Sequence, residues 1–214
     1  MENYEGHALT AVSLHHTLPQ PPERRGEERQ TTLLRVGKLL VEGEQRLCVI
    51  RNISSAGAMI KLYQPIDEGA RIEIEPTPDC PAEATVLWVR DDLAGVAFTD
   101  PVDVIAVLKG EGRAGPYRRV ARTPRLSVRR PARLCTEDAE FEVLLCDLSL
   151  NGAKIVTEQV LVEDSEIALF IDGLPALPGR VRWCHDAMAG MEFDIPIAMD
   201  MLAAWIGLDA GSSH

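Results

Sequence analysis

The sequence predicts a mainly β protein, built as two small β-barrels in tandem with a helix after each. Three observations predict it. From residue 31 onward, short runs of alternating apolar and polar residues follow one another, separated by turn residues. The sequence Asn-Ile-Ser-Ser-Ala-Gly-Ala at 52–58 has an echo, Asp-Leu-Ser-Leu-Asn-Gly-Ala, at 147–153. A segment rich in Gly, residues 109–116, lies between the two copies and marks a boundary.

The repeat holds a single register over most of each copy. The offset is 147 − 52 = 95 residues, and it also relates Trp88 to Trp183, Gly95 to Gly190, Phe98 to Phe193 and Pro101 to Pro196. Unrelated segments do not keep one register through strands, turns and a helix start, so the chain contains an internal duplication. We expect the recurring Trp and Phe residues to be core positions.

The elements of the first copy are predicted in order. Residues 33–41 and 46–50 form two strands around a turn at 42–44, and the strands 58–62, 71–75, 85–89 and 95–98 follow. Residues 101–108 change to helical spacing, with Pro101 suited to a first helical turn. In the last helix, Trp205 and Ile206 are predicted to expose an apolar face to a partner. A barrel closed by a helix leaves no exposed strand edges.

The predicted domain boundaries follow the changes in composition. Residues 1–23 are a flexible arm without sustained periodicity, and residues 24–108 form the first barrel domain. The linker covers 109–116, the second barrel domain 117–207, and a short tail 208–214.

Composition limits the function. The net charge of −11 disfavours nucleic acid and anionic membranes as partners, so any anion site must be local. The sequence shows no apolar run long enough for membrane insertion and no secretory signal, and we expect a cytoplasmic protein. The five cysteines are an odd number without a C-x-x-C pair, which indicates reduced thiols.

Two short motifs in the first copy carry groups suited to one anionic, purine-bearing ligand. Arg24 and Arg25 open an R-x-x-x-R pattern that ends at Arg29, and Asn52, Ser54 and Gly57 form N-x-S-x-x-G. A guanidinium binds phosphate or the O6/N7 edge of guanine in a bidentate manner. The amide and hydroxyl supply further donors and acceptors, and a glycine lets the backbone come close. Each motif alone has a simpler interpretation. The arginines could form local ion pairs with Glu27 and Glu28, and the N-x-S-x-x-G motif could be a turn that bonds to its own backbone.

With these motifs the chain resembles the PilZ family, bacterial receptors for cyclic diguanylate (c-di-GMP). The resemblance covers residues 24–108 and 117–206. It implies two six-stranded antiparallel barrels and a receptor that needs no cofactor besides its ligand. It also implies that Arg25 and Arg29 hold phosphate and guanine, and that a downstream protein partner receives the signal.

The second copy matches only half of the pattern. Asp147, Ser149 and Gly152 repeat the turn motif, but the offset places no arginine at 120 or 124. Arg118 and Arg122 form a displaced R-x-x-x-R, and Arg125 lies one position from the expected place. Either a small shift restores a second c-di-GMP site, or this copy has lost the ligand and kept the fold.

Two functions remain open from the sequence. The chain is either a c-di-GMP receptor that signals through its arm or domain arrangement, or a ligand-free adaptor that docks a partner protein. No catalytic or metal-ligating constellation recurs in both copies, so we do not expect an enzyme or a metal site. The distinguishing feature is whether arginines meet the face that carries Asn52 or Asp147.

Overall fold

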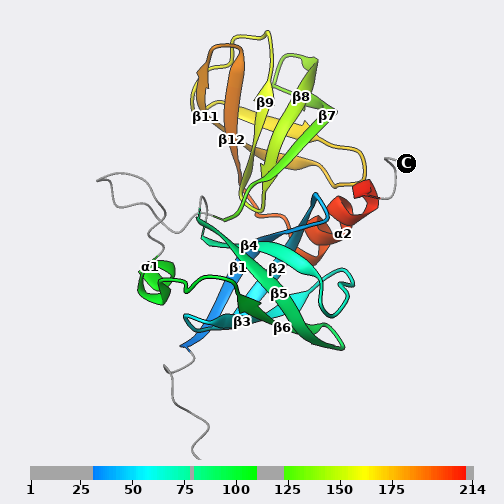
Figure 1. Ribbon diagram of the computed structural model, residues 1–214. Coiled ribbons are helices and arrows are strands. Elements are labelled where there is room, and N and C mark those ends of the chain that lie inside the picture. Colours follow the sequence, from blue (N-terminus) through cyan, green and yellow to red (C-terminus); the bar gives the residue numbers. More distant parts are fainter. Residues whose placement is uncertain (1–30, 78–79, 110–122, 211–214) are drawn as a thin grey trace, which may run out of the picture.

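The computed structural model describes residues 31–77, 80–109 and 123–210. They form two closed six-stranded antiparallel barrels, each followed by a short helix (Figure 1). This confirms the predicted fold class. No helix in the described ranges is both long and apolar enough to cross a membrane.

The first barrel has the strand order β1-β2-β3-β6-β5-β4. Its elements are β1 (Thr31–Val41), β2 (Glu44–Ile53), β3 (Gly57–Leu62), β4 (Arg71–Thr77), β5 (Cys80–Arg90), β6 (Leu93–Phe98) and α1 (Val104–Lys109).

The second barrel repeats this order as β7-β8-β9-β12-β11-β10. Its elements are β7 (Leu126–Cys135), β8 (Glu140–Ser149), β9 (Gly152–Val156), β10 (Glu166–Phe170), β11 (Leu177–His185), β12 (Met188–Phe193) and α2 (Met199–Ala210).

The irregularities of the two barrels also repeat. Register shifts occur between Thr32 and Arg35 in β1 and between Ser127 and Arg130 in β7, again 95 residues apart. The shift beside Asn52 recurs beside Asp147, and the shift before Trp88 recurs before Trp183. Bulges bend a strand and increase its twist, so both barrels curve at equivalent points. The duplication therefore extends to backbone geometry.

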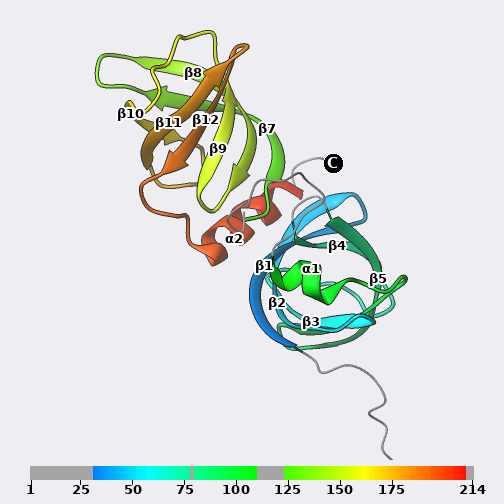
Figure 2. The same ribbon diagram turned by 90° about the vertical axis from the view of Figure 1, so that its left-hand side faces the viewer.

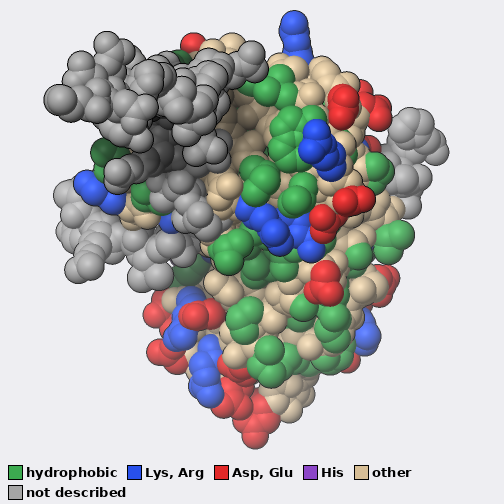
Figure 3. Space-filling model, turned by 90° about the horizontal axis from the view of Figure 1, so that it is seen from below, with side chains coloured by type: hydrophobic (Ala, Val, Ile, Leu, Met, Phe, Trp, Pro, Cys, Tyr) green, Lys and Arg blue, Asp and Glu red, His purple; other side chains and the backbone are tan. Residues whose placement is uncertain are grey.

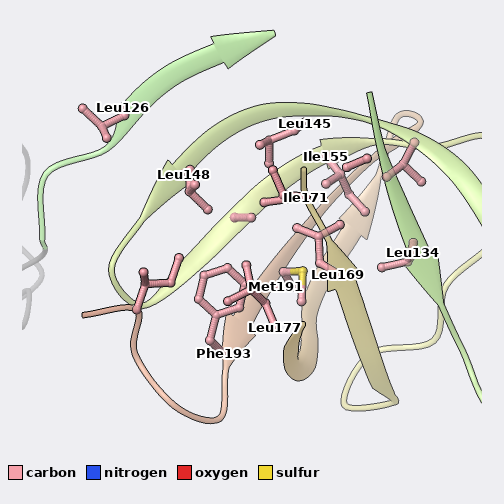
Figure 4. Close-up of a cluster of buried hydrophobic side chains, with 14 of the residues drawn as sticks. Leu126, Leu134, Leu145, Leu148, Ile155, Leu169, Ile171, Leu177, Met191 and Phe193 are labelled. Atoms are coloured by element: carbon pink, nitrogen blue, oxygen red, sulfur yellow. The ribbon is translucent and has the colours of Figure 1, made fainter. Parts of the chain in front are cut away.

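Each barrel encloses its own apolar core. Alternate strand residues point inward, and Leu39 and Ile74 are almost fully buried in the first barrel. Leu134 and Leu169 are buried in the same way in the second barrel (Figure 4). Burying such a side chain contributes about 1.5–3 kcal/mol to stability. Phe98 and Phe193 are buried as predicted. The thiol of Cys48 also lies in the first core, and burial raises its pKa to about 12.

The two repeated tryptophans are not interior. Trp88 and Trp183 are half-buried and lie on the outer surface, each across the glycine of the neighbouring strand. A Cβ atom on Gly95 or Gly190 would come within 2.1 Å of the Nε1 atom of the facing tryptophan. The expectation of core positions was therefore wrong for Trp, because the bulge turns the side chain outward onto a glycine gap.

Helix α1 begins later than the position of Pro101 suggests. The carboxylate of Asp103 accepts hydrogen bonds from the backbone N–H groups of Ile105 and Ala106, at 3.0 and 3.1 Å. Asp103 is thus the N-cap, and the preceding prolyl residue lies outside the helix. The resulting helical phase buries Val107 against the first core and exposes Ile105.

Helix α2 lies between the two barrels (Figure 2). Trp205 is buried, donates a 2.8 Å hydrogen bond to the carbonyl of Asp172, and has the guanidinium of Arg130 5.1 Å from its ring centroid. Ile206 is buried as well. The predicted exposed apolar face with Trp205 and Ile206 is wrong, because the tertiary structure covers both residues.

The first barrel contributes side chains to the core of the second. Leu47 is 3% exposed and belongs to the cluster that contains Trp205, and Val36 and Tyr63 pack against that cluster. The amide of Gln64 donates a 3.0 Å hydrogen bond to the carbonyl of Ala203 in α2. Gly207 has no side chain to obstruct this amide, since a Cβ atom there would lie 2.2 Å from it. The two barrels therefore share a packed interface.

Truncation of Leu47 should destabilise the protein although this side chain lies outside its own barrel. We expect Leu47→Ala to lower the free energy of unfolding by about 2–4 kcal/mol, because it leaves a cavity under α2. Leu87→Ala is the matched control, since Leu87 is 60% exposed, and it should cost no more than about 0.5 kcal/mol. Denaturant unfolding of both variants measures the difference, and equal effects would contradict the interface.

Candidate functional site

The candidate site begins at the turn between β2 and β3. The backbone N–H of Ser54 donates to the carbonyl of Gly57 at 2.8 Å, and its Oγ donates to the same oxygen at 3.2 Å. A Cβ atom on Gly57 would lie 2.3 Å from the carbonyl oxygen of Val96, which is backbone and cannot move aside. The motif glycine is therefore needed for close approach of β3 to β6.

The second barrel builds the same turn from Ser149 and Gly152. Ser149 Oγ donates to the Gly152 carbonyl at 3.1 Å, and a Cβ on Gly152 would lie 2.2 Å from the Met191 carbonyl oxygen. The serine and glycine of both motifs thus have a structural role that holds the preceding residue, Asn52 or Asp147, at a defined place on the outer surface.

The residues at the head of the two motifs differ in their surroundings. Asn52 is half-buried, and its side chain makes no hydrogen bond to another residue of the described ranges. Asp147 is 12% exposed and forms ion pairs with Arg125 at 2.6 Å and Lys154 at 3.2 Å. The structure therefore brings together two of the predicted second-copy residues, Arg125 and Asp147. The amide of Asn52 has its donors and acceptor available as far as the described residues are concerned.

Asn52 lies in a row of directly paired residues that crosses five strands. Thr32 pairs with Asn52, Asn52 with Met59, Met59 with Gly95, and Gly95 with Trp88. Paired residues of an antiparallel sheet project from the same face, and neighbouring strands are about 4.8 Å apart. The indole over Gly95 is thus about 10 Å from Asn52, with the thioether of Met59 between them.

The outer face around this row is mixed in character. Seen from the side on which β3 and β6 lie, the molecule shows hydrophobic side chains with Lys and Arg and also Asp and Glu side chains among them (Figure 3). Leu87 is 60% exposed, and the guanidinium of Arg90 lies 5.7 Å from the ring centroid of Trp88. Apolar and cationic groups together suit a ligand with both a flat ring and negative charge.

Five predicted arginines, Arg24, Arg25, Arg29, Arg118 and Arg122, lie outside the described residues. Strand β1 starts at Thr31, and its first two residues pair with Ile53 and Asn52. The strand that follows the R-x-x-x-R motif in sequence is therefore paired with the strand that carries Asn52.

Strand β1 also carries a cationic side chain within the described residues. Arg35 follows the β1 bulge, three residues after Thr32, and partial burial lowers the pKa of its guanidinium below the ordinary value. An arginine side chain keeps its proton at neutral pH, so Arg35 is a cation.

Sequence reasoning missed Met59 and Lys154 and placed Trp88 in the core. A signal was present, because Met59 and Lys154 are related by the offset of 95 residues that relates Asn52 to Asp147. The offset identifies equivalent positions, but only the pairing of strands shows that they adjoin the motif residue. Within the described ranges, no group of three or more His, Cys, Asp or Glu side chains is placed to hold a metal ion.

Replacement of the motif glycine should disturb the turn. We expect Gly57→Ala to destabilise the protein by about 1–3 kcal/mol, because the new methyl group overlaps the Val96 carbonyl. Ser55→Ala in the same turn is the control and should have a small effect. Thermal unfolding of both variants is the measurement, and a neutral Gly57→Ala would show that β3 can move away from β6.

Known proteins were compared with this chain by sequence and by structure. A search of curated proteins gives no match. Among solved structures, the PlzA protein of Borreliella burgdorferi in complex with c-di-GMP is 15% identical, with 85% of this chain and 94% of that chain covered and a TM-score of 0.34. YcgR of Escherichia coli in complex with c-di-GMP is 14% identical over 82% and 83% of the two chains, with a TM-score of 0.34.

The Bacillus subtilis inhibitor of motility MotI/DgrA is 13% identical, covers 86% of this chain and 100% of its own, and has a TM-score of 0.34. These values are low, so the assignment to a family rests on sequence. The PilZ domain family matches twice, at residues 23–108 and 118–207, which is most of the chain. The chain therefore belongs to the PilZ domain family, as a tandem of two such domains.

Proposed function

We propose that this protein is a c-di-GMP receptor whose ligand binds on the first barrel. The observation that carries the proposal is the available amide of Asn52, directly beside the point where the R-x-x-x-R segment joins β1. Membership of the PilZ domain family supports it, and PlzA and YcgR are both in complex with c-di-GMP in their solved structures.

The ligand chemistry fits these side chains. Arg24, Arg25 and Arg29 supply forks for the phosphates and for the O6/N7 edge of a guanine. Asn52 supplies one acceptor and two donors for the rest of a base. The hydroxyl of Ser54 already donates to Gly57, so its contribution is to hold the turn and to offer its remaining lone pairs.

Trp88 provides a surface for a guanine ring. Its indole is half-buried, occupies the space that a side chain on Gly95 would take, and shares the row with Asn52. Stacking of a base on an aromatic ring contributes about 1–3 kcal/mol. Met59, between the two residues, offers a polarisable apolar contact.

The signal passes through the N-terminal segment in this proposal. The barrels are joined by Leu47 and by the Gln64–Ala203 hydrogen bond, so a ligand on the first barrel acts most directly on the residues that precede Thr31. Carboxylates of Glu27 and Glu28 lie between the arginines in sequence, and exposed pairs with them are worth only about 0–1 kcal/mol. An anionic ligand can therefore replace them and order this segment for a downstream protein partner.

The arginine of the complete motif should matter most for binding. We expect the protein to bind c-di-GMP with a Kd in the micromolar range or tighter, about −8 kcal/mol or better. Arg29→Ala should weaken binding by about 1.5–3 kcal/mol, the value of a charge-assisted hydrogen bond. Arg125→Ala is the matched control and should have less effect. Calorimetric titration measures all three proteins. No binding to the native protein would favour the adaptor function, and a larger loss from Arg125→Ala would place the site on the second barrel.

The tryptophan of the first barrel should contribute to affinity, and its counterpart should not. Trp88→Leu keeps an apolar side chain over Gly95 but removes the stacking surface, so affinity should fall about tenfold or more. Trp183→Leu makes the same change on the second barrel and controls for the loss of packing on a glycine. Quenching of tryptophan fluorescence by c-di-GMP gives a second readout, and equal affinities of the two variants would remove Trp88 from the site.

Ligand should order the segment before β1. We expect amide hydrogen exchange across residues 22–35 to slow when c-di-GMP saturates the protein, because the arginines exchange local pairs for the ligand. The exchange of residues 140–149 serves as an internal reference. Unchanged protection of 22–35 at full saturation would show that the arginines are already in place before binding.

A further inference from the structure

In the second barrel, two cationic side chains pair with the motif residue Asp147. The Asp147 carboxylate, 12% exposed, pairs with Arg125 at 2.6 Å and with Lys154 at 3.2 Å, and these three side chains are termed the Asp147 cluster. The offset of 95 residues relates Arg125 to Gln30 and Lys154 to Met59. Neither cation has a counterpart in the first copy, so the cluster is specific to the second barrel.

The tryptophan beside the cluster is also engaged. Trp183 pairs with Gly190, which pairs with Lys154, and its ring stacks on His185 with centroids 4.9 Å apart and planes 29° apart. The residue equivalent to His185 in the first barrel is Arg90, which approaches Trp88 as a cation at 5.7 Å. The groups that would face a ligand on the second barrel are thus satisfied by neighbouring side chains.

The cluster adjoins a contact between the two barrels. The amide of Gln45, at the start of β2, donates to the carbonyl of Ser127 at 2.9 Å and accepts from the Ser127 backbone N–H at 3.0 Å. Ser127 is the pairing partner of Asp147 and comes two residues after Arg125. The side chain of Gln45 therefore makes two hydrogen bonds to the backbone of β7 at Ser127. This residue lies directly opposite Asp147 and its ion pairs.

We propose that the Asp147 cluster fixes the start of β7 as the docking point for Gln45 of the first barrel, and that it does so in place of binding c-di-GMP. Arg125 holds the strand from its beginning, and Lys154 holds Asp147 from β9. A carboxylate with two cations keeps the strand end in one place, so both hydrogen bonds to Gln45 form together. The statement that the second barrel does not bind c-di-GMP rests on the proposed function, but the docking role does not.

Asp147→Asn is a suitable test variant because the first barrel carries Asn52 at the equivalent position and folds in the same way. The matched control is Glu140→Gln, which removes a carboxylate from the same strand, where Glu140 pairs with Arg133 at 2.6 Å on the exposed surface. Gln45→Ala removes the docking contact directly. Hydrogen exchange of the Ser127 amide, which donates to Gln45, reports on the contact without any ligand.

We expect exchange at Ser127 to be about tenfold faster in Asp147→Asn and in Gln45→Ala, and unchanged in Glu140→Gln. The double variant Asp147→Asn/Gln45→Ala should be no faster than the faster single variant, because both act through one contact. Unchanged exchange in Asp147→Asn, or multiplied effects in the double variant, would overturn the docking role.

Titration with c-di-GMP tests whether the second barrel takes part in ligand binding. Asp147→Asn should bind c-di-GMP within about twofold of the native affinity, whereas Asn52→Ala should lose about tenfold or more. A tenfold loss of affinity in Asp147→Asn would show that the second barrel does take part in binding c-di-GMP, and it would overturn this part of the proposal. If the native protein binds no c-di-GMP, the proposed function fails, and the exchange experiment still decides the docking role.

Discussion

The packing of α2 between the barrels is the interaction on which the arrangement of this protein depends. The helix follows the second barrel in sequence, yet the first barrel contributes Leu47 to the cluster that buries Trp205. Removing apolar surface from water is the dominant favourable term in such a contact, while the bonds made by Gln64 and Gln45 give it direction. This packed interface explains why two domains with separate cores form one structure.

Against this common frame, the duplicated copies have diverged at a few surface positions. Both keep the serine and glycine of the turn, since the close approach of Gly57 and Gly152 to backbone carbonyls leaves no room for a side chain. They differ where the turn presents its polar residue. In the first copy a neutral amide is not bonded to any other described residue, whereas a carboxylate in the second is neutralised by two cations. One fold can thus carry a candidate ligand site in one copy and an internal contact in the other.

Much of the fold could be predicted from periodicity because the strands alternate and the two copies share one register. The buried Phe98 and Phe193 follow from that reasoning, and so does the position of the turn motifs. Trp88 did not, because a bulge shifts the alternation by one residue and turns the ring outward over Gly95. The start of α1 was missed for a local reason, since the Asp103 cap defines the first turn and not the proline before it.

The sequence by itself determined the duplication, the barrel class and the identity of the motif residues, because these depend on spacing and residue type along the chain. It could not decide whether Trp205 would be exposed or buried, since that depends on a surface contributed by β2 of the other copy. Nor could it show that Asn52 and Asp147 have different surroundings. That difference is decided by the neighbours that strand pairing brings alongside, Met59 in one barrel and Lys154 in the other, and by an arginine that only the folded β7 places against a carboxylate.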